Sequence, residues 1–182
     1  MRFETPAYSG NEFEYDLFGQ VDIRDPKYLV ELAKATTDKQ TGYVPFRQAV
    51  DLAKKFQPGD PTNPKKDFLR ELRIELVDKL GLETEKDADA VKVFTAVKTP
   101  LDAFHGADAF VTFTKNGKEI LVTLDASLRK DKITGIDKSK ADVLIGEMPM
   151  PEEDEDAYLQ AIENVVDKIA RQIELKERRP AA

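Results

Sequence analysis

Apolar side chains recur at every third or fourth position in four stretches of the chain, which is the spacing of amphipathic helices. The first two stretches are short. One begins at Asp25-Pro26, where an aspartate N-cap precedes a proline in the first turn, and it ends near residue 35. The other begins around Pro45 and keeps its apolar stripe as far as Phe56. We therefore expect two small helices in the first half of the chain, each burying one face.

Two longer helices are predicted on either side of the central strands. The first covers residues 67–80 and is preceded by a cap at Thr62 or Asn63. The second starts in the acidic turn at 152–156 and ends among basic residues at 171–179, so both of its ends complement the helix dipole. These two helices carry the largest apolar stripes and are expected to cover the sheet.

Alternating, β-branched segments predict four strands, all in the second half of the chain. They cover residues 91–97, 107–114, 118–126 and 141–145. Asn116-Gly117, between the second and the third, is typical of a two-residue type I′ hairpin turn. The remaining segments are expected to lack long helices or strands: an arm (irregular or a short strand) over the first two dozen residues, the proline-rich run at 57–64, the acidic run at 83–90 (a loop or a loose turn) and a break at Thr99-Pro100.

The hairpin turn determines which residues face each other. With a two-residue turn, one face of the hairpin is wholly apolar and carries Ala109, Val111, Phe113, Ile120, Val122 and Leu124. A three-residue turn would mix polar and apolar residues on both faces and would separate Asp108 from Asp125. Because the favoured register is the one that gathers the apolar residues on a single face, we expect the first arrangement. It sets Asp108 opposite Asp125 at a non-hydrogen-bonded position, where side chains come closest.

Composition narrows the classes of protein to consider. The 182 residues suffice for one domain with a full core, and they include no cysteine, which removes disulfides, thiolate metal sites and thiol nucleophiles. No apolar leader or membrane span is visible, so we expect a cytoplasmic protein without membrane contact. The net charge of −7 disfavours indiscriminate nucleic-acid binding. Lysines do cluster at 54–55, 65–66 and 130–140, and we interpret them as solvated loop charges.

The paired aspartates are the feature of the sequence that points to chemistry. Two carboxylates about 5 Å apart repel by roughly 3 kcal/mol at an effective dielectric constant near 20. A bound cation, a neighbouring Lys or Arg, or a shared proton would relieve that repulsion. The next pair along, Gly106 and Ser127, is small and leaves room above this face. Hard oxygen ligands with room for water suit Mg²⁺ or Mn²⁺. The alternative is that both side chains point into water at the end of the sheet.

The stretch HGADAFVTFTKNGKEILVTLDASLRK resembles the hairpin of the PD-(D/E)XK nuclease superfamily. In that family an acid on one strand is followed by an acid on the next, and a glutamate from the preceding helix often completes the metal site. The resemblance implies Asp108 and Asp125 as catalytic metal ligands, with Glu75 or Glu71 as the helical acid.

The family also places a lysine two residues after the second acid. Ser127 stands at that position, so the resemblance implies that Arg129 or Lys130 supplies the positive charge from nearby. His105 is the one histidine and excludes paired-histidine mechanisms. It could border the site, but a loop histidine of this kind more often bonds a backbone carbonyl.

Together these features predict an α+β protein with a small mixed sheet of about four strands, flanking helices and a restriction-endonuclease-like core. Residues 1–60 would form an N-terminal arm and helical part, 61–175 the core and 176–182 a tail, all within one compact unit. The function expected is that of a divergent nuclease-like protein that uses Mg²⁺ or Mn²⁺ on the phosphodiesters of a nucleic acid. The alternative is a non-catalytic structural or protein-interaction domain with a degenerate site, which binds a protein partner or a second copy of itself.

Overall fold

A computed structural model of the chain describes residues 9–133 and 139–179. In chain order its elements are α1 (Gly10–Phe18), α2 (Pro26–Ala35), α3 (Phe46–Lys55), α4 (Asp67–Lys79), α5 (Glu85–Ala88), β1 (Val91–Thr95), α6 (Pro100–His105), β2 (Ala109–Lys115), β3 (Lys118–Ala126), α7 (Lys130–Ile133), β4 (Val143–Ile145) and α8 (Glu155–Glu177).

The four strands form one mixed sheet in the order β1-β2-β3-β4. β2 is antiparallel to both β1 and β3, whereas β4 runs parallel to β3. The α+β class and the four-stranded mixed sheet are therefore confirmed. Each strand begins and ends within two residues of its predicted bounds.

The hairpin has the predicted register. Asn116 and Gly117 have φ angles of 53° and 76°, the left-handed values that a type I′ turn requires at both central positions. All six residues of the predicted apolar face are paired and buried as expected: Ala109 with Leu124, Val111 with Val122, and Phe113 with Ile120.

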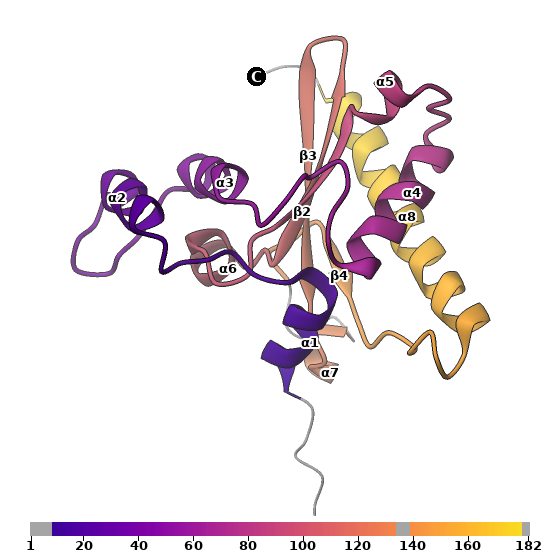
Figure 1. Cartoon of the computed structure of the whole chain (residues 1–182), viewed down its shortest axis with the longest axis horizontal. Coiled ribbons are helices and arrows are strands. Elements are labelled where there is room, and N and C mark those ends of the chain that lie inside the picture. Colours follow the sequence, from indigo (N-terminus) through magenta and orange to yellow (C-terminus); the bar gives the residue numbers. More distant parts are fainter. Residues whose placement is uncertain (1–8, 134–138, 180–182) are drawn as a thin grey trace, which may run out of the picture.

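Helices cover both faces of the sheet (Figure 1). α4 and α8 pack against the apolar face of the hairpin and form the main core with it. α3 and α6 pack on the opposite face, around Phe94 and Phe110, whose rings stack 4.8 Å apart. Within the described residues, none of the helices has both the length and the apolar character that a membrane crossing requires.

The N-terminal segment is a helix, so the prediction of an irregular or strand-like arm is wrong there. Ser9 and Glu12 form a capping box at the start of α1, in which each side chain accepts the backbone N–H of the other residue. Phe13 and Leu17, one turn apart, are buried in the main core. The scattered aromatic residues of this segment obscured a capping signature that the sequence contains.

A helix also begins where a simple break was predicted. The Thr99 hydroxyl accepts the N–H of Leu101, Pro100 occupies the first turn of α6, and the helix closes at Gly106 with a φ of 64°. The same cap-and-proline signature begins α2 at Asp25-Pro26. α6 is too short to show a helical apolar period, which is why the pattern of hydrophobic positions did not reveal it.

The start of α4 differs from the prediction. α4 begins at Asp67 with Lys66 at its N-cap and no side-chain cap, and Thr62 instead donates its N–H and its hydroxyl to Asp60 in a turn. The run at 83–90 contains the single helical turn α5, which Thr84 caps.

Candidate metal centre

Acidic side chains from four parts of the chain gather at the end of the hairpin opposite its turn. Glu14 comes from α1, Asp102 from α6, Asp108 from the residue before β2, and Asp125 from the penultimate position of β3. Figure 1 shows α1 and α7 at this end of the sheet. The Asp125 charge is close enough to raise the pKa values of the other three carboxyl groups.

Three of these acids form a tight group. Glu14, Asp102 and Asp108 each place one carboxylate oxygen so that the three oxygens lie within 4.8 Å of one another. Asp108 is 3% exposed, and the other two side chains are half-buried. Three oxygens at this spacing can bind one cation in common, and without one their full ionisation is unfavourable.

Backbone donors hold two of the carboxylates in place. The N–H of Ala126 donates to Asp108 Oδ2 at 2.8 Å, and the N–H of Lys98 donates to Asp102 Oδ2 at 2.9 Å. Lys98 has a φ of 70°, which is unfavourable for a residue with a side chain. A strained backbone position that orients a half-buried acid is typical of a functional site.

The sequence predicted that Asp108 lies directly opposite Asp125, and the structure does not have this pair. The Asp108 N–H donates to the carbonyl of Leu124 at 2.9 Å, although Leu124 is already the partner of Ala109. Two residues of one strand thus face one residue of the other, as at a β-bulge, which re-aims the side chain. The regular ladder therefore ends at Ala109, and the Asp108 side chain reaches across to Ala126.

Asp125 has a positive partner of its own. Its Oδ2 atom lies 3.1 Å from Lys132 Nζ and accepts a 2.7 Å hydrogen bond from the Ser139 hydroxyl. Lys132 lies on α7. Of the two cations named from the sequence, Arg129 is exposed and pairs with Asp131, and Lys130 is exposed.

Burial and mutual repulsion keep protons on this group of acids. Burial raises the pKa of Asp108 to about 8, and the charges of Glu14, Asp102 and Asp125 add to this effect, which the Ala126 N–H opposes. Burial also raises the pKa of Glu14 to about 7, assisted by Asp102 and Asp125 and opposed by Lys132. Burial likewise raises the pKa of Asp102. A divalent cation would take the place of these protons near neutral pH.

The helical acids named from the sequence are not brought to this centre. α4 packs along α8, where Glu75 lines a groove together with Asp156 and Leu159. Glu71 interacts with the hydroxyl of Tyr158, and its Oε2 atom is buried without a hydrogen-bond partner among the described residues. The helical acids beside Asp108 are Glu14 of α1 and Asp102 of α6.

The sequence contained signals for two of the three residues that were missed. The Ser9–Glu12 capping box marks the helix that carries Glu14, and Thr99-Pro100 marks the helix that carries Asp102. Lys132 has no such local signal. His105 is not part of the group. It is the last residue of α6 and not a loop residue, but its Nε2 atom lies 2.9 Å from the carbonyl of Val44, which is the kind of backbone contact that was expected.

No family model matches the chain, and neither does any curated protein or solved structure.

Proposed function

We propose that this chain is a cytoplasmic, metal-dependent nuclease-like enzyme that binds Mg²⁺ or Mn²⁺ through Glu14, Asp102 and Asp108. One observation carries the proposal: three carboxylate oxygens from separate segments of the chain lie within 4.8 Å of one another, close to Asp125 and its partly buried partner Lys132. Such a group of hard oxygen donors suits a divalent cation of this class.

The bound cation would polarise a phosphodiester and lower the pKa of a water ligand. Lys132 would present its ammonium group to the negative charge that develops on the phosphoryl oxygens. Asp125 is a positioning residue in this scheme, since its carboxylate accepts a hydrogen bond from Lys132 and is itself held by the Ser139 hydroxyl. Asp108 would be the central ligand, because the Ala126 N–H orients it from the neighbouring strand.

These roles parallel those that the PD-(D/E)XK resemblance implies. A helical acid, an acid at the first strand, an acid on the second strand and a lysine all lie at one end of the hairpin. Glu14 takes the place expected of Glu71 or Glu75, and Lys132 that of Arg129 or Lys130. A nucleic acid is accordingly the substrate class that we propose.

A non-catalytic protein with the same fold is the second candidate. Two observations favour it: Ser127 occupies the usual lysine position, and Lys132 is already paired with Asp125. In this case the acids would have a structural role and the chain would bind a protein partner.

Cleavage assays separate the two candidates. Wild type and Asp108→Asn, purified identically, would be incubated with plasmid and single-stranded substrates in the presence of Mn²⁺. We expect slow cleavage by the wild type and none by the variant. Equal cleavage by both would indicate a contaminant, and no cleavage by either would favour the non-catalytic protein.

A further inference from the structure

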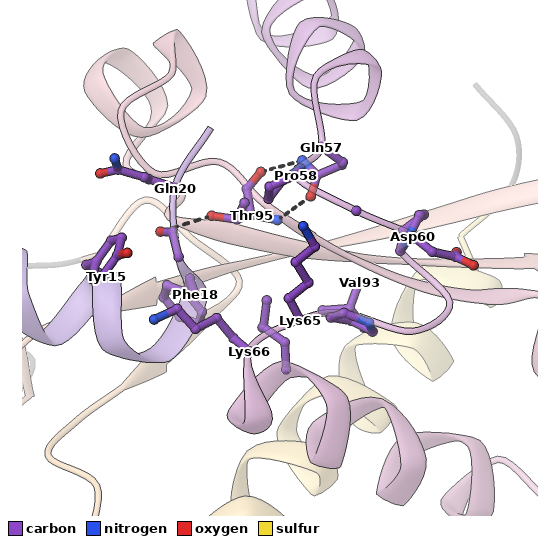
Figure 2. A pocket seen from close by; sticks show the side chains of 15 residues that line it. Tyr15, Phe18, Gln20, Gln57, Pro58, Asp60, Lys65, Lys66, Val93 and Thr95 are labelled. Atoms are coloured by element: carbon purple, nitrogen blue, oxygen red, sulfur yellow. Dashed lines mark hydrogen bonds between the residues drawn. The ribbon is translucent and has the colours of Figure 1, made fainter. Parts of the chain in front are cut away.

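A separate pocket lies between α1, the loop that precedes α4, and the outer edge of β1 (Figure 2). Its volume is about 210 Å³, and Tyr15, Phe18, Pro58, Lys65 and Lys66 are among the side chains that line it. None of the four acids of the candidate metal centre lines this pocket. It is therefore a second place where a small group can bind.

The loop that forms one wall is tied to the sheet. The Gln57 side chain donates to the Thr95 carbonyl at 2.7 Å and accepts from the Thr95 N–H at 2.9 Å, as the dashed lines in Figure 2 show. The carbonyl of Pro61 accepts the N–H of Val93 at 2.9 Å. The loop thus provides hydrogen-bond partners for Val93 and Thr95 on the outer edge of β1, and these bonds fix this wall of the pocket in place.

Two glycines make room for the lysine side chains. A Cβ atom at Gly59 would lie 3.3 Å from Lys65 Cε, and one at Gly19 would lie 3.5 Å from the stem of Lys66. Gly19 also has a φ of 70°, which favours glycine. Each lysine stem therefore packs across a glycine, which directs its ammonium group along the wall of the pocket.

Neither ammonium group has an acidic partner among the described residues. Lys66 Nζ lies 4.2 Å from the centroid of the Tyr15 ring, a cation–π contact. Asp60, the acidic residue that lines the pocket, accepts hydrogen bonds from Thr62 instead. Two uncompensated positive charges beside one pocket, in a chain with a net charge of −7, indicate an anionic ligand.

We propose that this pocket binds the phosphate group of a nucleotide or of a nucleic-acid strand, held by Lys65 and Lys66. Lysine binds phosphate as a point charge, and the pocket has room for one phosphate and part of a nucleoside, but not for a duplex. Tyr15 and Glu14 are adjacent on α1, so a strand anchored here would pass the helix that supplies a ligand to the metal centre. Binding at the pocket itself requires no metal.

The test is a binding titration of the full chain in EDTA. The probes are inorganic phosphate, a mononucleotide and a short labelled single strand. We expect Lys65→Ala/Lys66→Ala to lose at least about tenfold in affinity, because both charged contacts disappear. The matched control, Lys39→Ala/Lys118→Ala, removes the same charge from exposed positions away from the pocket and should bind like the wild type.

A second variant separates the effect of the position of Lys65 from the effect of its charge. Gly59→Val keeps both lysines but displaces the Lys65 stem, and it should also weaken binding. Tighter binding of the strand than of the mononucleotide would identify a strand as the source of the phosphate, and equal binding would identify a nucleotide. The proposal is overturned if no probe binds, or if the lysine double variant binds as well as its control. A chain that binds these probes but never cleaves a nucleic acid keeps this proposal and loses the proposed function.

Discussion

The backbone N–H of Ala126 donates a 2.8 Å hydrogen bond to the carboxylate of Asp108 across the β2–β3 hairpin. This contact exists because the ladder ends at Ala109 and Asp108 shares Leu124 with it. The buried Asp108 side chain thereby lies beside Glu14 and Asp102 instead of directly opposite Asp125.

Stability of the metal-free protein should fall as pH rises. The folded-state pKa values of Asp108 and Glu14, about 8 and about 7, lie above the value near 4 of an unfolded carboxyl group. Between these pKa values the folded state therefore binds more protons than the unfolded state. The stabilisation that these protons give the folded state is complete below about pH 4 and lost by about pH 8. Denaturant unfolding of wild type and Asp108→Asn in EDTA, at several pH values, measures this pH dependence of the free energy of unfolding. The variant should gain stability relative to wild type as the pH is raised from about 5 to about 8.5. A pH-independent difference would contradict the assigned protonation.

A divalent cation should raise the melting temperature. A ligand that binds only the folded state contributes about 2.7 kcal/mol when its concentration is a hundred times its Kd. Glu14→Gln and Asp102→Asn should each reduce the shift caused by Mn²⁺ or Mg²⁺. Glu75→Gln is the matched control and should keep the full shift, because Glu75 lies against α8. Loss of the shift in Glu75→Gln alone would place the cation elsewhere.

Replacement of Lys132 should reduce cleavage more than replacement of Lys130. Loss of one positive group that stabilises a transition state costs about 10²–10³ in rate. Lys132→Ala also leaves Asp125 without its cation, so its folding must be checked by unfolding experiments. Lys132→Arg keeps the charge and should recover part of the activity. Equal cleavage rates for Lys132→Ala and Lys130→Ala would show that Lys132 has no special role in the proposed cleavage.

The cap of α1 should influence metal affinity. Ser9→Ala removes one half of the capping box and costs about 1 kcal/mol of helix stability. Since α1 carries Glu14, fraying of its first turns should weaken Mn²⁺ binding, measured by titration. Asn11→Ala, an exposed change in the same turn, serves as the control. Unchanged affinity in Ser9→Ala would show that core packing of Phe13 and Leu17 alone positions Glu14.

The strands and the hairpin were predictable from the sequence because their signals are local. Asn116-Gly117 specifies the turn, and the turn together with one apolar face specifies every pair from Ala109–Leu124 onward. α2 and α8 were predictable for a similar reason, since a cap or an acidic first turn precedes residues with helical apolar spacing.

Which acidic residues meet at the centre was decided by the tertiary structure. Glu14 and Asp102 belong to short helices whose position depends on how α1 and α6 pack against the end of the sheet, which no local pattern specifies. Lys132 reaches Asp125 because of the path of the chain from β3 into α7, and the bulge at Asp108 depends on its contacts with Ala96 and Leu124. Local hydrogen bonds and side-chain periodicity are set by neighbours in the sequence. The convergence of carboxylates is set by the sum of many weak packing contacts between distant segments, and it exists only once the chain has folded.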